Sequence, residues 1–193
     1  MALSASLALI GALLAAPALA QEAPDALVKR VTEEVTQHKD IRSGDPAKLR
    51  AVVQTKLVPH IDTRRVTQIA LGQHWRRATP EQQDRLEREF TALVVRTYSG
   101  ALANYRDQAI EVLPLRAAAG DTDVTVRSRI RQPGAETISI EYDLARTEAG
   151  WKVYDVRVAG VSLVATYRTT FSEEVRNRGI DGLISTLAAK NRA

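Results

Sequence analysis

The sequence predicts an α+β fold, a single domain in which several helices pack on one face of a curved antiparallel sheet of four strands. Apolar residues recur at steps of three and four over 24–38 and 80–108, which is the spacing of helices with one buried face. The period changes to two over 109–158, as in strands with one buried face, and helical spacing returns afterwards. Since no repeat or low-complexity linker divides residues 21–193, we expect them to form one domain.

Three helices are expected in the N-terminal part of this domain. The first covers 24–38 and has an apolar face of leucine and valine. Asp45 can cap the second, and Pro46 suits its first position because proline lacks the N–H group that would lie there unbonded. Asp62 can cap a short third helix that ends near Leu71.

A capping box is the strongest local signal in the chain. Thr79 can cap, Pro80 suits the first helical position, and Gln82 can complete the box. A long helix is therefore expected from here to about Gln108. Its apolar stripe consists of Leu86, Phe90, Leu93, Val94, Tyr98, Ala101, Leu102 and Tyr105.

Four later segments alternate apolar and polar residues, with turn signals between them. They are 109–115, 123–131, 136–146 and 151–158. In the last segment the alternation places Tyr154 on the same face as Val156 and Val158, with Val153 on the polar face. Short connections such as Pro133-Gly134 predict a meander in which each strand pairs antiparallel with the next.

Helical spacing resumes after Gly160, which ends the predicted sheet. We expect a helix over 161–178, closed by Gly179 because glycine readily adopts the left-handed conformation that follows a helix end. A last helix is expected near 181–190.

The residue types exclude several classes of chemistry. The chain has no cysteine, which excludes disulfides, cysteine-ligated zinc or iron–sulfur sites, a thiol nucleophile and a lipid-modified N-terminal cysteine. The three histidines, His38, His60 and His74, are not at metal-ligand spacing. Neither the Gly-x-Ser-x-Gly motif of hydrolases nor a phosphate-binding glycine loop is present. We therefore expect no catalytic residue, no metal and no cofactor.

One enzyme class stays open as an alternative, a small-molecule isomerase on a cone-shaped α+β fold. Asp143 and Asp155 each follow a tyrosine, as a Tyr/Asp pocket of that kind would require. Such an acid needs burial to shift its pKa, whereas the alternation puts Asp143 on the polar face.

The basic balance of the chain does not indicate nucleic-acid binding. The sequence has 27 Lys and Arg against 23 Asp and Glu, a net charge of +4, and a pI of about 9.6. Arg127, Arg129 and Arg131 follow one face of a strand, but Glu141 and Asp143 on the next strand can pair with them. We expect a solvated or partner-docking sheet face, and at most a weak attraction to an anionic membrane surface.

The first twenty residues predict an export signal. Residues 1–20 are mainly apolar, carry no charged side chain, and end in Ala18-Leu19-Ala20 after Pro17. We expect a cleaved signal peptide and a mature chain that begins at Gln21, although no Lys or Arg precedes the apolar run. The alternative is a membrane anchor, which the shortness of the run and its interruption by Pro17 disfavour.

The order of motifs along the chain resembles one known family. The motifs are Leu57-Val58-Pro59-His60-Ile61-Asp62, Leu71-Gly72-Gln73-His74-Trp75, Ala78-Thr79-Pro80-Glu81-Gln82-Gln83, Gly150-Trp151-Lys152-Val153-Tyr154-Asp155-Val156, Gly160-Val161-Ser162-Leu163-Val164 and Gly179-Ile180-Asp181-Gly182-Leu183. Each is weak alone, but the ordered set, which spans residues 24–190, resembles the MlaC family of periplasmic phospholipid-binding proteins, also called the toluene tolerance or Ttg2-type auxiliary family.

This resemblance implies a function and a location. Members of the family are soluble periplasmic carriers that shuttle phospholipid between an outer-membrane lipoprotein–porin complex and an inner-membrane ABC transporter with an MCE-domain ring. They maintain the lipid asymmetry of the outer membrane. The resemblance therefore implies a periplasmic monomer that holds phospholipid as cargo, binds no nucleic acid, and encloses an apolar lipid cavity between sheet and helices.

The residues themselves show only suitable apolar faces, for which a solid core is the ordinary interpretation and a hollow is the alternative. With the resemblance, we expect a lipid-binding wall contributed by the long helix, the sheet and the helix that follows it. The expected wall consists of Val94, Tyr98, Leu102, Tyr105, Val126, Ile130, Ile140, Tyr142, Val156, Val158, Val164, Tyr167 and Phe171. The three helical tyrosines can place their hydroxyls at the mouth. Another lipid, such as a hopanoid, is the alternative cargo.

Overall fold

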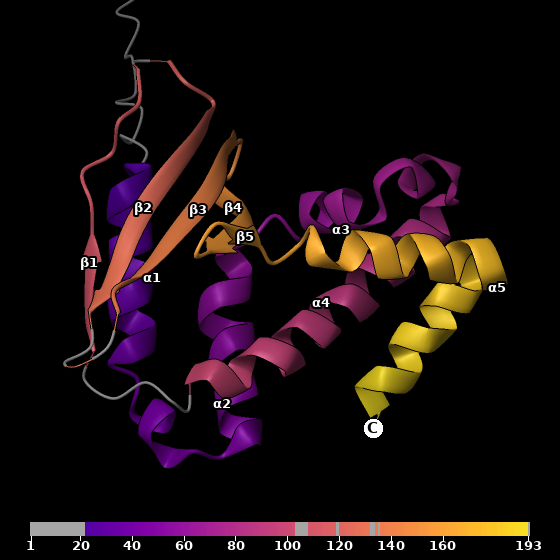
Figure 1. The fold of residues 1–193 in the computed structure, drawn as a ribbon, viewed down its shortest axis with the longest axis horizontal. Coiled ribbons are helices and arrows are strands. Elements are labelled where there is room, and N and C mark those ends of the chain that lie inside the picture. The colour runs from indigo at the N-terminus through magenta and orange to yellow at the C-terminus, as the bar shows by residue number, and fades with distance from the viewer. Residues whose placement is uncertain (1–21, 103–107, 119, 132–133, 135, 193) are drawn as a thin grey trace, which may run out of the picture.

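The computed structural model describes residues 22–102, 108–118, 120–131, 134 and 136–192. A five-stranded antiparallel sheet lies on one side of the molecule with helix α1 (Pro24–Thr36) along it. Helices α3 (Thr63–Leu71), α4 (Pro80–Leu102) and α5 (Thr166–Arg192) gather on the other side (Figure 1). Helix α2 (Pro46–Val52) packs against α4. The predicted α+β architecture is confirmed.

In the part of the chain that the structure describes, the helical elements are five α-helices and several shorter helical turns. The α-helices are α1 (Pro24–Thr36), α2 (Pro46–Val52), α3 (Thr63–Leu71), α4 (Pro80–Leu102) and α5 (Thr166–Arg192). A π-helical turn (Val53–Leu57) continues α2, and the 3₁₀ turns are Lys39–Ser43, Val58–His60 and Gly72–Arg77.

The predicted helix caps are present. The backbone N–H of Thr79 donates to Gln82 Oε1 at 3.1 Å, and the N–H of Gln82 donates to Thr79 Oγ1 at 3.2 Å, which completes the capping box of α4. Asp45 Oδ1 accepts the N–H of Ala47 at 2.8 Å at the start of α2. Local sequence signals therefore decide where these helices begin.

Helices α4 and α5 can each be compared with a predicted helix end. Helix α4 is described as far as Leu102, and Gln108 is no longer helical; residues 103–107 of the predicted extension lie outside the described residues. Helix α5 is interrupted at Gly179, whose φ of 72° and ψ of −179° separate two helical segments. The sequence predicted a helix end at this glycine, and the interruption confirms it.

The sheet has one strand more than the four predicted. Its strands, which pair in chain order, are β1 (Ala109–Val112), β2 (Asp123–Arg131), β3 (Ile138–Thr147), β4 (Gly150–Val158) and β5 (Val161–Ser162). The fifth strand takes the start of the segment predicted as helix 161–178, and α5 begins only at Thr166. Ala159 and Gly160 both have positive φ, 49° and 81°. Two consecutive residues with positive φ make a tight hairpin turn that returns the chain beside β4.

A β-bulge corrects the predicted facing of β4. Asp143 pairs with Asp155 and Leu144 pairs with Val153, so Tyr154 is an extra residue without a partner on β3. The bulge puts Val153 on the inner face with Val156, whereas the ring of Tyr154 lies 3.6 Å below the guanidinium of Arg65 in a cation–π contact. Simple alternation gave the opposite facing for residues 153 and 154.

Among the described residues, most of the buried apolar side chains belong to two hydrophobic cores. The helical core lies among α3, α4 and α5 and contains Ala70, Leu71, Trp75, Ala78, Leu86, Phe90, Val164, Phe171, Leu183, Ile184 and Leu187. The sheet core lies among α1, α2 and the sheet and contains Leu27, Val28, Val31, Val35, Ile41, Leu49, Val52, Val124, Val126 and Leu144. In the described part of the chain, no helix is both long and apolar enough to span a bilayer.

Candidate functional site

An apolar cavity of about 390 Å³ lies beside the sheet core. Its wall combines the inner face of the sheet, one face of α1, and the segment that joins α2 to α3. The lining residues are Leu27, Val28, Val31, Thr32, Val35, Thr36, Leu57, His60, Ile61, Leu102, Gln108, Ile110, Ile130, Ile140, Tyr142, Val153 and Val156. This volume is in the range of natural ligand sites, which is roughly 300–1,000 Å³.

Helix α1 supplies one side of the cavity because its apolar residues share one face. Leu27, Val31 and Val35 follow each other at four-residue steps, and each is at least nine-tenths buried. Thr32 and Thr36 border this apolar face and also line the cavity. An amphipathic helix thus covers part of the sheet and leaves a hollow beneath it.

The inner face of the sheet changes from closed to open along its length. Val126 and Leu144 are fully buried, whereas Ile130 and Ile140 are half-buried and line the cavity. Ile138, which pairs with Ile130, is 42% exposed. The hollow is therefore packed shut toward the sheet core and more accessible toward the β2–β3 hairpin.

Tyr142 brings a polar group into this apolar wall. Its hydroxyl accepts a hydrogen bond of 3.4 Å from Ser128 Oγ and also lies near the hydroxyl of Thr32 on α1. Burial raises the pKa of the Tyr142 phenol, so the group stays neutral. The ring presents apolar surface to the cavity, and the hydroxyl is a hydrogen-bonding group within this apolar wall.

His60 is a titratable group in the cavity wall. Burial lowers its pKa, and the positive charges of Arg30 and Lys152 lower it further, while Glu34 and Glu22 act in the opposite direction. Around it, Arg30 Nη2 lies 2.8 Å from Glu22 Oε2. Lys152 Nζ donates to the carbonyl oxygen of Pro59 at 2.5 Å. Charged side chains are thus held next to an apolar hollow, the arrangement that an amphipathic ligand requires.

The structure brings five of the thirteen predicted wall residues together in this cavity. They are Leu102, Ile130, Ile140, Tyr142 and Val156. The first comes from α4 and the others from three consecutive strands of the sheet. Residues predicted from α4 and from the sheet therefore line the same cavity.

Four predicted residues lie in the helical core instead of along the cavity. They are Val94, Val164, Tyr167 and Phe171. The ring of Phe90 explains this position, because its centroid lies 4.9 Å from that of Tyr167 and 5.0 Å from that of Phe171, in edge-to-face packing. Helices α4 and α5 therefore bury these stripes against each other and not against the sheet.

Three of the other four predicted residues lie outside the lining of the cavity. Val126 is fully buried in the sheet core beside Tyr142. Tyr98 and Val158 are half-buried and lie outside the lining. Tyr105 lies outside the described residues.

The sequence-based prediction named no α1 residue of the cavity wall. The lining residues it did not name are Leu27, Val28, Val31, Thr32, Val35, Thr36, Leu57, His60, Ile61, Gln108, Ile110 and Val153. A signal was available, because α1 has a strong apolar face. Nothing in that face says whether the helix covers a solid core or a hollow.

The acids that a Tyr/Asp enzyme pocket would use lie away from the cavity. Asp143 is buried, but its carboxylate is bound by the Arg157 guanidinium and by Thr125 Oγ1, which is 2.7 Å away. Asp155 Oδ1 accepts the N–H of Val156 at 2.8 Å. Neither acid is among the lining residues. Among the described residues, no group of three or more His, Asp or Glu side chains could hold a metal ion.

Comparison with known proteins matches the whole domain. The family model described as MlaC protein matches residues 25–189. The intermembrane phospholipid transport system binding protein MlaC of Haemophilus influenzae is 24% identical over 179 residues, which cover 88% of this chain and 83% of that protein. The toluene tolerance protein ttg2D of Pseudomonas putida is 25% identical over 168 residues, covering 84% and 78%.

A solved structure adds a ligand to this comparison. It is a phospholipid-binding protein from Ralstonia solanacearum in complex with a phospholipid, and it is 40% identical to this chain. The match has a TM-score of 0.79 and covers 87% of this chain and 96% of the other. The Haemophilus influenzae and Ralstonia solanacearum proteins are thus both named for phospholipid transport or binding. With a matched model over residues 25–189 and relatives that agree, this chain belongs to the MlaC protein family.

Proposed function

We propose that this protein is a periplasmic phospholipid carrier that holds acyl chains in the cavity between α1 and the sheet and leaves the headgroup outside. The observation that carries the proposal is the apolar cavity of about 390 Å³, in a chain 40% identical to a protein solved with a phospholipid. Its lining is mainly aliphatic, which suits acyl chains, and its few polar groups set no strict headgroup pattern.

The energetics of lipid transfer explain why such a carrier is needed. A phospholipid with two sixteen-carbon chains has about 28 methylenes, and at about 0.8 kcal/mol for each buried CH₂ their exposure to water costs on the order of 20 kcal/mol. Unassisted crossing of an aqueous compartment is therefore negligible. An apolar cavity replaces the bilayer interior, so that transfer into and out of the carrier is nearly balanced.

A balanced carrier cannot set the direction of transport by itself. A conformational or binding equilibrium shifts only by the differential affinity of the partners for its states. We therefore assign direction to the partners, which we propose are an inner-membrane ABC transporter with an MCE-domain ring and an outer-membrane lipoprotein–porin complex. The function served is the lipid asymmetry of the outer membrane.

A transfer assay tests this proposal. Donor vesicles with a fluorescent phospholipid and unlabelled acceptor vesicles are separated by a membrane that passes protein and retains vesicles. The mature protein is expected to move label into the acceptor compartment in proportion to its concentration. Equal label transfer with and without the protein would contradict the proposal. Preferential transfer of a labelled hopanoid in the same assay would identify a hopanoid, and not a phospholipid, as the cargo.

A further inference from the structure

A second concave surface lies outside the cavity. Two adjoining depressions of about 550 and 510 Å³ follow α4 where it faces α2 and the π-helical turn. Both are lined by Gln54 and Ala92, so we treat them as one continuous groove, called here the α4 groove. It shares no lining residue with the cavity.

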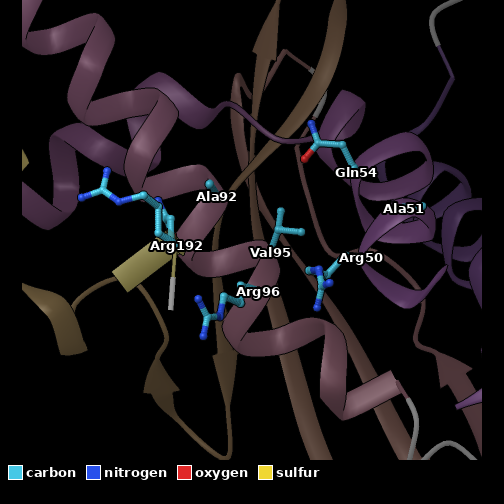
Figure 2. Close-up of a pocket in the computed structure, with 8 residues that line it drawn as sticks. Arg50, Ala51, Gln54, Ala92, Val95, Arg96 and Arg192 are labelled. Carbon is cyan, nitrogen blue, oxygen red and sulfur yellow. The ribbon is translucent and has the colours of Figure 1, made fainter. Parts of the chain in front are cut away.

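One end of the α4 groove is strongly cationic. Arg50 reaches it from α2, Arg96 from α4 and Arg192 from the end of α5, and Figure 2 shows the α4 residues lying between those of α2 and Arg192. Arg88 lines the groove farther along α4. Buried Val95 and the small Ala92 lie on the same stretch of the helix, so the surface between the charges is low and partly apolar.

Most of these arginines lack an acidic partner. Among the described residues, the side chains of Arg50, Arg88 and Arg192 form no hydrogen bond or ion pair, and the guanidinium of Arg96 donates only to the carbonyl oxygen of Lys190. On the sheet the situation differs, because Arg131 Nη2 lies 2.7 Å from Glu111 Oε2. The groove therefore contains positive charge that the fold does not neutralise.

The acids of the groove are already engaged. Glu87 Oε1 accepts from Thr63 Oγ1 at 2.6 Å, and Asp84 Oδ1 lies 3.1 Å from Arg64 Nη1. Among the described residues, neither acid forms an ion pair with an arginine of the groove. A ligand for this surface must bring its own carboxylates or phosphates.

We propose that the α4 groove docks an acidic segment of a partner protein. The length of the groove favours a polypeptide, because Asp84 and Arg96 are twelve residues apart on one helix, which is about 18 Å at 1.5 Å per residue. Carboxylates about 12 Å apart on the segment match the spacing of Arg88 and Arg96. A single phosphate fills one end only, and a flat bilayer surface does not enter a groove between helices. Arginine guanidinium groups bind carboxylates through paired hydrogen bonds.

The docked segment has a physical connection to the cavity. The elements that form the two walls of the groove also reach the cavity, because Leu57 of the π-helical turn and Leu102 of α4 both line the cavity. A partner seated in the groove therefore contacts the elements that reach the cavity. The docking itself does not depend on what the cavity holds.

A peptide-binding measurement tests the inference. The probe is a fluorescein-labelled, alanine-rich helical peptide of about sixteen residues with glutamate at every fourth position, compared with the same peptide carrying glutamine. The protein is expected to bind the glutamate peptide on the order of tenfold more tightly, with affinity falling as salt rises. The variant Arg50→Glu with Arg88→Glu should lose affinity on the order of tenfold.

The matched control is Arg76→Glu with Arg85→Glu, which makes the same charge change at exposed arginines that do not line the groove. It should bind the glutamate peptide within about twofold of the unchanged protein. Equal losses in both double variants would overturn the proposal. The proposal would also be overturned if the Arg50→Glu/Arg88→Glu variant lost binding to phosphatidylglycerol vesicles but kept its affinity for the glutamate peptide. Bound lipid, measured in the same samples, should be unaffected, which separates this result from the proposed function.

Discussion

At the scale of single residues, the cavity depends on a few aliphatic side chains at the accessible end of the sheet. Ile140 is half-buried in the wall, while its neighbour Ser139 points to the exposed outer face of the same strand. Neighbouring residues of a strand face opposite sides. The pair therefore offers a site substitution and a matched control one position apart.

The substitution Ile140→Glu should abolish lipid binding. A carboxylate in an apolar wall without a partner costs several kcal/mol when acyl chains remove its water. Ser139→Glu should bind lipid like the unchanged protein. The measurement is the amount of phospholipid extracted per mole of purified protein, with circular dichroism to establish folding. Full lipid content in a folded Ile140→Glu variant would refute the assignment of the cavity as the binding site.

His60 gives the cavity a predictable pH dependence. Its pKa is lowered from the ordinary 6.5 by burial and by Arg30 and Lys152. The unfolded chain therefore binds more protons than the folded one as the pH falls through this window. Protonation of His60 therefore favours the unfolded chain. The free energy of unfolding keeps its full value above pH 6.5 and decreases as the pH falls through the folded-state pKa of His60.

We therefore expect the free energy of unfolding to fall more steeply between about pH 7 and about pH 5 for the unchanged protein than for His60→Gln. Urea unfolding of both proteins across this range measures the difference. The glutamates near the cavity, Glu22 and Glu34, have lowered pKa values and lose their contribution at lower pH. Parallel pH profiles for the two proteins would show that His60 is not the group responsible.

At the scale of elements, the structure separates a supporting helical core from the ligand cavity. Phe90, Tyr167 and Phe171 pack edge to face between α4 and α5. None of them lines the cavity. Damage to this cluster should therefore reduce stability without removing the lipid site.

Phe90→Ala should lower the free energy of unfolding by about 3–5 kcal/mol, because it leaves a void in the helical core at a side chain that is 1% exposed. The variant should still contain phospholipid after purification under native conditions. Urea titration and lipid extraction measure the two effects. Loss of lipid from a variant that remains folded would show that the two cores are coupled.

Gly179→Ala tests the interruption of α5. The φ of 72° and ψ of −179° lie in a region that is essentially restricted to glycine and costs a residue with a side chain about 1–3 kcal/mol. Gly100 is the matched control, since it lies inside α4 with open space around the position of a Cβ atom, and alanine there should stabilise by up to about 1 kcal/mol. Changes of the same sign in thermal unfolding of the two variants would contradict this account.

Local signals predicted the elements better than their contacts. The caps at Asp45 and Thr79 and the helix break at Gly179 depend on neighbouring residues, so they could be identified directly. The positive φ of Ala159 and the bulge at Tyr154 depend on pairing with other strands and could not. The turn at Ala159 starts strand β5 where a helix was predicted, and the bulge at Tyr154 places Val153 on the inner face of β4.

Placing the site required knowing which apolar stripes meet. Several stripes of similar composition were available, and a stripe fits a solid core as well as a hollow. The sheet residues Ile130, Ile140 and Val156 were predicted and do line the cavity. The opposite wall comes from α1 and not from α5, because the aromatic rings of α5 pack against α4.

At the scale of the whole molecule, two sites occupy different surfaces. The apolar cavity lies between α1 and the sheet, and the cationic α4 groove lies between α2, α4 and the end of α5. The chain has a net charge of +4, and several of its unpaired arginines lie in the α4 groove, where they can attract an acidic partner. Because these two surfaces share no lining residue, we expect cargo and docking partner to bind at the same time.

The central claim is that the cavity carries one phospholipid, and native mass spectrometry of the purified protein tests it most directly. The account predicts a complex heavier than the mature chain by the mass of one phospholipid, converted to the free chain by delipidation and restored by incubation with phospholipid vesicles. Ile140→Glu should give only the free mass. A protein that shows the free mass in every preparation, or an adduct whose mass belongs to a different class of molecule, would contradict the account.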